Sequence, residues 1–398
     1  MTRQLREFIF YCFNQISVEL QSESMLSLAE RKTGLNDWGN LAFREPLDVL
    51  LEALRREAKL SQRGRFVVAQ HYMRLLCNIL KIVDDWKRHP EIAHVPVEAP
   101  IVILGFPRTG TTYLHSLLSR DPAFRTMQYW ELLFPSPPPD PAAHRQDPRK
   151  RQARRFAFFI GKISPKLSAI HELSAEAVEE CCFIFDHFFL DNIHHLVFDI
   201  PSYIEWYDKH DALPSYRFHR RMLQYYGWKF SFERYALKAP RHLFCLKDLL
   251  AVYPGAMIVW THRNPESALP SLCSLSETAR RIISDDIDNR RIGRLCLDHF
   301  DKDFKAGWAA RKNFAPGQFY DVPYRELVHD PIGVVQKIYR HFNLSYTEEL
   351  DANLCESISH AKKQPREKHR YSLEQFGLHR DAIHERLRDY YDHFGKYC

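Results

Sequence analysis

The sequence lacks several patterns that define common protein classes. Its nine cysteines are scattered, with no C-x-x-C pair and no spacing typical of zinc ligands. We therefore expect reduced thiols in a cytoplasmic protein that holds no metal. No stretch reaches the roughly 18 apolar residues of a membrane span. The apolar patch at Phe8–Phe13 is too short for a signal peptide, so we expect neither feature.

A strong excess of one charge is also missing. The chain has 56 Lys and Arg residues against 50 Asp and Glu, a net charge of +6. This small excess is compatible with an anionic ligand, but it does not indicate a nucleic-acid partner. With 398 residues, 45% of them hydrophobic, the chain is long enough for one large α/β domain or two modest ones, and nothing in it selects an oligomeric state.

The first part of the chain shows helical periodicity only. One helix is predicted after Pro46, and a second over residues 66–86, ended by His89-Pro90. We expect residues 1–96 to form a helical cap on the domain that follows, residues 97–398. The apolar positions of the first helix are Leu47, Leu50, Leu51, Leu54 and Ala58.

Strand and helix patterns alternate from Pro100 onward. Continuous apolar runs predict buried strands at Ile101–Leu104 and Met257–Trp260, and Gln318–Val322 is predicted as a further strand. A helix is predicted over Ile332–Phe342. The alternation indicates an α/β fold, a parallel sheet with helices on both faces. Residues 174–190 are predicted to form one buried helix, because they are apolar around most of a helical circumference.

A basic cluster follows the proline-rich loop Pro135–Pro141. We interpret it as a solvated helix face, with attraction of an anionic acceptor as the alternative. Its members are Arg149, Lys150, Arg151, Arg154 and Arg155.

The most informative segment is Gly105-Phe-Pro-Arg-Thr-Gly-Thr-Thr112, between the first strand and a helix. Its glycine spacing is that of a nucleotide-triphosphatase loop, but Thr111 stands where that loop has lysine. Backbone N–H groups at such a turn, with the helix dipole behind them, form a nest for a tetrahedral anion. Arg108 adds a permanent charge, and the threonines add hydroxyl donors. The segment therefore predicts a phosphate or sulfate site.

A second candidate anion site follows the strand at Met257–Trp260. Arg263 comes at the carboxyl end of that strand, where ligands bind in open α/β sheets. Asn264 and Pro265 are typical helix-start residues, and Ser271 lies two turns further on. Pro270 is expected to disturb this helix and to free backbone groups near Ser271.

Together these motifs resemble those of a known enzyme family. GFPRTGTTYLHSLL resembles the 5′-phosphosulfate loop of sulfotransferases, and HRNPESALPSL resembles their 3′-phosphate motif. The order of the two motifs and their separation along the chain match those of the family. Further segments, including YALKAPRHLF, are similar to the bacterial branch of the family. The resemblance implies a three-layer P-loop-like fold. It also implies 3′-phosphoadenosine-5′-phosphosulfate (PAPS) as the donor of a sulfuryl group, without a metal.

The resemblance also implies roles for individual residues. Arg108 and Lys238 would stabilise charge near the sulfuryl group, and Arg263 and Ser271 would hold the 3′-phosphate. A basic C-terminal segment would close over that phosphate through Arg370 and Tyr371. The residues implied around the 5′-phosphate are Thr109, Gly110, Thr111 and Thr112.

The catalytic base and the acceptor stay open at this stage. His242 lies near the family's histidine, but the chain has Lys238-x-x-x-His242 where cytosolic members have Lys-x-His. His171, shortly before Glu179 and Glu180, is the second candidate, since histidine titrates near neutral pH. The acceptor is expected to be a hydroxyl or an amine of a small molecule, a lipid or a glycan. A kinase or NTPase with a degenerate loop, and a catalytically silent nucleotide-binding protein, are the alternative functions.

Overall fold

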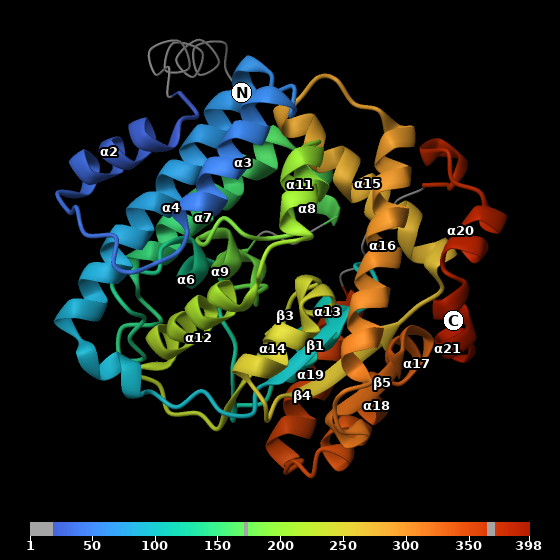
Figure 1. Ribbon diagram of the computed structural model, residues 1–398. Helices are drawn as coiled ribbons and strands as arrows, with labels where there is room; N and C mark the ends of the chain where they lie inside the picture. Colours follow the sequence, from blue (N-terminus) through green and yellow to red (C-terminus); the bar gives the residue numbers. More distant parts are fainter. Residues whose placement is uncertain (1–18, 171–173, 364–370) are drawn as a thin grey trace.

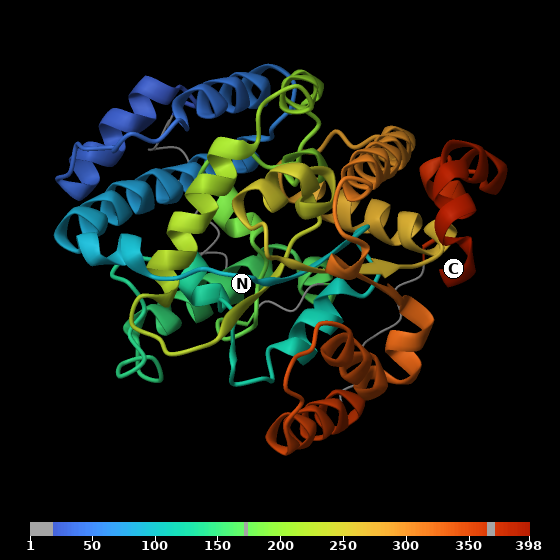
Figure 2. The ribbon, with the colours of Figure 1, turned by 60° about the horizontal axis from the view of Figure 1, so that its bottom comes forward.

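A five-stranded parallel sheet lies at the centre of the molecule, with helices on both faces (Figures 1 and 2). The structure is a computed structural model that describes residues 19–170, 174–363 and 371–398. The strand order β2-β3-β1-β4-β5 confirms the predicted α/β fold. The strands are β1 (Ile101–Gly105), β2 (Phe124–Arg125), β3 (Arg234–Lys238), β4 (Met257–His262) and β5 (Phe319–Pro323).

The central strand β1 is buried on both faces. Val102 and Leu104 belong to the main hydrophobic core, whereas Ile101 and Ile103 belong to a second core. Successive side chains of a strand point to opposite faces, so the two cores lie on opposite sides of the sheet. The sheet is therefore the middle one of three layers, as a continuous apolar run predicts.

Helices from distant parts of the chain cover each face. The main-core face carries α12 (Leu213–Gly227), α13 (Arg241–Phe244), α14 (Leu246–Val252), α15 (Pro265–Ile283) and α16 (Asn289–Arg311), joined by η3 (Glu374–Phe376), α20 (Arg380–Arg386), α21 (Arg388–Phe394) and η4 (Gly395–Tyr397). The second face carries α5 (Thr111–Leu118), α17 (Tyr324–His329), α18 (Pro331–His341) and α19 (Glu348–Lys363). The short η2 (Pro316–Gln318) precedes β5.

The N-terminal part is helical, as predicted. It comprises α2 (Ser22–Thr33), α3 (Arg44–Arg56), α4 (Gln62–Arg88) and η1 (Pro90–His94). Its apolar faces join the main core together with α9 (Cys182–Asp186), α10 (His194–Val197) and α11 (Pro201–Tyr207). The N-terminal helices share the main core with later parts of the chain. The predicted boundary at residue 96, between a helical cap and an α/β domain, therefore stays a prediction.

Helix α4 is the one helix in the described ranges that is long and apolar enough to cross a membrane. Its most apolar window, however, is 61% buried inside the protein. Tyr72, Leu76 and Leu80 of this helix are fully buried in the main core. Burial of this kind is typical of the core helix of a globular protein.

The segment predicted as one helix over 174–190 is helical only in α9, so this prediction was wrong. Before α9 the chain makes a turn at residues 175–176 and then a bridge between Gln128 and Val178. Glu179 N donates to Met127 O (3.0 Å), and Cys181 N donates to Lys238 O (2.9 Å). The segment is apolar because neighbours surround it, and its backbone bonds go to those neighbours rather than along a helix.

Two smaller predictions also need correction. Arg149 and Lys150 begin α7 (Pro148–Ile163) as buried residues, so the basic cluster is not wholly a solvated face. Arg149 lies over the Trp130 ring of α6 (Tyr129–Leu133), 4.7 Å from its centroid. Helix α15 continues through Pro270 to Ile283. Proline removes only its own N–H, so the helix can bridge one missing bond.

Candidate active site

The loop after β1 is shaped by two glycines with positive φ. Gly105 has φ 144°, and a Cβ there would lie 2.6 Å from both Thr261 O and Thr261 Oγ1. Gly110 has φ 92° and is the N-cap of α5. Other residues rarely adopt such angles, so the glycines permit a sharp turn that presents the start of α5 at the carboxyl edge of the sheet.

The two predicted anion sites meet in space. Arg263 Nη1 donates to Arg108 O (2.8 Å), and Arg108 Nε donates to Ser271 Oγ (3.1 Å). Strands β1 and β4 are neighbours, so the loops that follow them leave the sheet side by side. The structure thus brings Arg108, Arg263 and Ser271 into one hydrogen-bonded group.

Two tyrosine side chains lie beside this group. The Arg263 guanidinium carbon lies 4.3 Å from the centroid of the Tyr324 ring, a cation–π contact. Burial lowers the pKa of Arg108, while the nearby Tyr371 phenol acts in the opposite direction. Half-buried Tyr371 therefore lies close to Arg108, whereas its predicted companion Arg370 is outside the described residues.

The threonines of the loop divide into two kinds. Thr109 is fully buried, and its hydroxyl lies 2.6 Å from both Phe106 O and Thr261 Oγ1. This hydroxyl ties the loop to β4. Thr111 and Thr112 begin α5, and Thr112 is exposed. Of the two residues at the helix start, Thr112 is therefore the one exposed to solvent.

Lys238, the last residue of β3, connects this loop with the segment before α9. Its Nζ forms an ion pair with Glu180 and donates to Thr112 Oγ1 (3.2 Å). The Lys238 side chain is only 2% exposed, whereas that of Glu180 is 17% exposed. The pair places one cation and one carboxylate at the helix start, next to the arginines. The sequence analysis identified Lys238 as a site residue, but it did not identify the ion pair of Lys238 with Glu180.

His242 lies in a different environment from the one predicted for a catalytic base. It is fully buried on α13, with Nδ1 2.9 Å from the Tyr216 hydroxyl. Among the described residues its Nε2 has no hydrogen-bond partner. Burial lowers the pKa of His242 well below its usual value, and His219, Arg241 and Lys238 lower it further. The second candidate, His171, lies outside the described residues.

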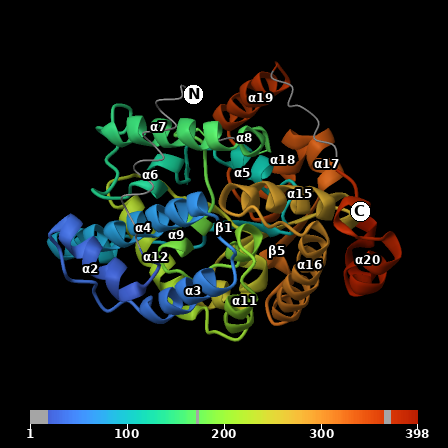
Figure 3. The same ribbon diagram turned by 90° about the horizontal axis from the view of Figure 1, so that it is seen from above.

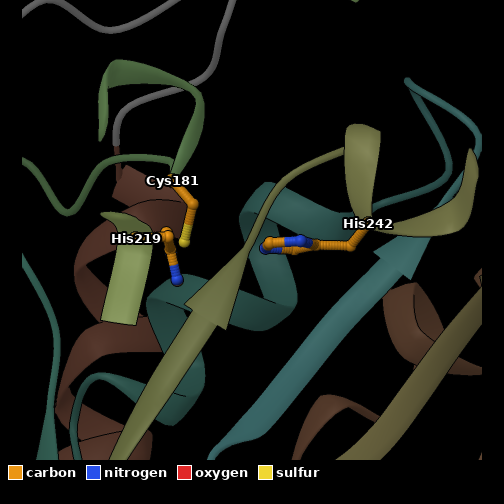
Figure 4. A group of neighbouring side chains, drawn as sticks. All are labelled: Cys181, His219 and His242. Carbon is orange, nitrogen blue, oxygen red and sulfur yellow. The ribbon is translucent and has the colours of Figure 1, made fainter. Parts of the chain in front are cut away.

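His242 gathers with Cys181 and His219 in the interior (Figure 4). Their ligand atoms lie within 4.8 Å of one another, a combination that could hold a transition metal. Arg241 is also fully buried, and its charge lowers the pKa of both histidines, after burial. Two neighbouring cations, Arg241 and Lys238, oppose a further positive charge, so we assign no metal to these side chains.

A second group of polar side chains lies at the end of β4, and the sequence analysis did not identify it. Arg311 binds Asp321 of β5 through both carboxylate oxygens (2.7 and 2.8 Å), and His262 Nε2 lies 2.9 Å from Asp321 Oδ1. Burial alone would raise the pKa of Asp321, but these two partners hold it at about 2. The network fixes the end of β4 directly before Arg263.

A cavity of about 320 Å³ lies away from this site, between the loop after α3 and the C-terminal end of α15. Four of its charged side chains form ion pairs. Lys59 binds Asp286, and Arg291 binds Asp199.

Three comparisons with known proteins bear on this arrangement. The sequence model described as the sulfotransferase family matches residues 100–348. A crystal structure of the sulfotransferase STF1 from Mycobacterium tuberculosis is 32% identical, with a TM-score of 0.84, over 92% of this chain and 98% of that one. A crystal structure of STF9 from Mycobacterium avium is 26% identical, with a TM-score of 0.88, over 95% and 98%.

A curated relative has a more specific name. The omega-hydroxy-beta-dihydromenaquinone-9 sulfotransferase Stf3 of Mycobacterium tuberculosis is 27% identical over 265 residues. The match covers 63% of this chain and 64% of the relative, so it spans less than two thirds of that protein.

Proposed function

Because the chain belongs to the sulfotransferase family, whose members are enzymes, we propose that it transfers a sulfuryl group from PAPS to a hydroxyl of a lipid-like acceptor. The observation that carries this proposal is the hydrogen-bonded group of Arg108, Arg263 and Ser271 beside the helix start of α5. Two cations and a row of backbone donors at one edge of the sheet suit a ligand with two separate anionic groups.

The residues present fit this donor. The N-terminus of α5, with Gly110, Thr111 and Thr112, would hold the 5′-phosphosulfate. Arg263 and Ser271 would hold the 3′-phosphate, and Tyr371 would stand beside Arg108. When bound, PAPS supplies the sulfuryl group that moves to the acceptor oxygen. The Thr109 hydroxyl shapes the loop, because it is already bonded to Phe106 and Thr261.

Lys238 and Glu180 suit the chemistry of the transfer. The Lys238 ammonium would offset the negative charge that develops on the departing phosphate oxygen. Glu180, held by Lys238 and still partly exposed, would accept the proton of the acceptor hydroxyl. His242 is less suited to this step, because it is fully buried and its Nδ1 is engaged by Tyr216.

The acceptor class follows from the relative's name. Stf3 is named for a hydroxylated menaquinone, a lipid with an aromatic head, so we propose an alcohol or phenol with a large apolar part. Phe183, half-buried three residues after Glu180 and 5.4 Å from the Tyr129 ring centroid, would provide an apolar contact near the base. Free cysteines throughout the described residues support a cytoplasmic location.

A transfer assay tests this function. The protein is incubated with PAPS carrying radioactive sulfur and a panel of hydroxylated quinones, phenols and simple sugars. We expect labelled product from an apolar hydroxyl compound without added metal, and loss of that product in Lys238→Met. Labelling that requires ATP and Mg²⁺, or release of phosphate from ATP, would instead identify a kinase or NTPase.

A further inference from the structure

Helix α7 presents an exposed face that combines aromatic and basic side chains. Phe158 is 67% exposed and Phe159 is 43% exposed. In the described part of the chain, Val328 is the only other exposed large hydrophobic residue. Arg151, Arg155, Phe158 and Lys162 are spaced three or four residues apart, so they share one side of the helix.

The opposite side of α7 fixes this orientation. Ala153 and Ala157 are buried in a small core with Trp130 and Leu133 of α6. Lys162 Nζ lies 5.3 Å from the Phe158 ring centroid, which keeps charge and ring together at the surface. The two phenylalanines therefore stay outside because the helix is already anchored by its other face.

The exposed face is also positively charged overall. Helix α7 has no acidic residue. Three acids that contact α7, its N-cap or α8 are engaged by other bases, since Asp147 binds Arg149, Glu176 binds Arg154, and Glu277 binds Lys166 of α8 (Pro165–Ile170). Among the described residues, no carboxylate pairs with Arg151, Arg155 or Lys162.

We propose that α7 is a membrane-docking helix that lays this face on an anionic lipid bilayer. Phe158 and Phe159 enter the boundary between headgroups and acyl chains, while Arg151, Arg155 and Lys162 meet the lipid phosphates. A bilayer suits this face better than nucleic acid, because adjacent rings need an apolar layer and the chain's net charge is only +6.

The position of α7 is compatible with such contact. In Figure 3 it runs along the outer edge of the molecule, beside α8 and on the side opposite α3. From α8 the chain leads to Glu180, so a docked α7 lies next in sequence to the segment that carries the proposed base. Membrane docking itself does not depend on the donor or the acceptor.

Vesicle flotation tests this proposal. The wild-type chain is mixed with vesicles of phosphatidylglycerol and phosphatidylcholine, or of phosphatidylcholine alone, at low and high salt. We expect binding to the anionic vesicles and much weaker binding at high salt. The double variant Phe158→Ser/Phe159→Ser, and separately Arg151→Gln/Arg155→Gln, should each reduce binding about tenfold or more.

Matched variants serve as controls. Val328→Ser removes an exposed apolar side chain elsewhere, and Arg55→Gln/Arg56→Gln removes two exposed charges from α3. Both should bind vesicles as the wild type does, and circular dichroism checks the folding of every variant. Equal binding by all variants, absence of binding, stronger retention on DNA than on vesicles, or self-association that Phe158→Ser/Phe159→Ser abolishes would each overturn membrane docking.

Discussion

The Arg263 guanidinium donates a hydrogen bond to the main-chain oxygen of Arg108, 2.8 Å away, and so joins the loops that follow β4 and β1. Arg108 in turn reaches Ser271 on α15. Arg263 thereby holds the loop after β1, and Arg108 holds on to α15, before a ligand binds. Such preorganisation reduces the entropy lost on binding, because the two segments are already joined before the nucleotide binds.

Glu180→Gln should impair turnover while donor binding persists. Removing a general base typically lowers the rate by a factor of about 10² to 10⁴, and Glu180 is the carboxylate paired with Lys238. The measurement is kcat for sulfuryl transfer, beside calorimetric binding of the product nucleotide. Glu176→Gln, which removes a carboxylate paired with Arg154 at the surface, is the control. Unchanged kcat in Glu180→Gln would remove Glu180 from the mechanism.

His242→Ala should affect stability more than catalysis. The change leaves the buried Tyr216 hydroxyl without its partner, and an unsatisfied buried group costs about 1–3 kcal/mol. Urea unfolding should show this loss, while kcat per folded molecule stays close to that of the wild type. A large loss of kcat with unchanged stability would restore His242 as the base.

Gly105→Ala should destabilise the protein. At φ 144° the new methyl group would meet Thr261 O and Oγ1 at 2.6 Å, and strain of this kind costs about 1–3 kcal/mol. Gly317→Ala is the matched control, because it has no atom within 4 Å of a built Cβ. Thermal melting should separate the two variants clearly. Equal melting temperatures would show that the loop relaxes without cost.

Asp321→Asn should lower stability at neutral pH by about 2 kcal/mol, since one pKa unit corresponds to about 1.4 kcal/mol. The folded-state pKa of Asp321, about 2, lies below its ordinary value of 3.8. The carboxylate therefore contributes stability above pH 3.8, and this contribution disappears as the pH falls toward 2.

Urea unfolding at a series of pH values checks this dependence. The free energies of unfolding of the wild type and Asp321→Asn should converge below pH 4. The exposed carboxylate Glu98 provides a control, and Glu98→Gln should follow the wild type throughout. A difference between wild type and Asp321→Asn that stays constant down to pH 2 would contradict the assigned ion pair.

Local sequence patterns were sufficient for much of the fold. Strands β1 and β4 were predictable because each contains a short apolar run, and β5 was predicted although Asp321 interrupts its apolar residues. The family resemblance is confirmed by the family match over residues 100–348. Strand β2 has only two residues, and β3 begins and ends with charged residues, so neither shows that pattern.

The candidate site was predictable where one short segment carries it. The loop with Arg108 and the helix start with Arg263 and Ser271 are local motifs, and the structure brings them together. The ion pair of Lys238 with Glu180 joins segments almost sixty residues apart. Glu180 was assigned to a continuous buried helix, and the non-helical course of its segment depends on backbone bonds to Met127 and Lys238.

Calorimetric titration of 3′-phosphoadenosine-5′-phosphate and of ADP, without divalent metal, tests most directly whether Arg263 binds the 3′-phosphate of the nucleotide. We predict that the wild type binds the 3′-phosphorylated nucleotide at least about tenfold more tightly than ADP, as a charge-assisted hydrogen bond would provide. In Arg263→Ala most of that difference should disappear, while ADP affinity changes little. Equal affinities for the two nucleotides in the wild type, or an undiminished preference in Arg263→Ala, would contradict the account.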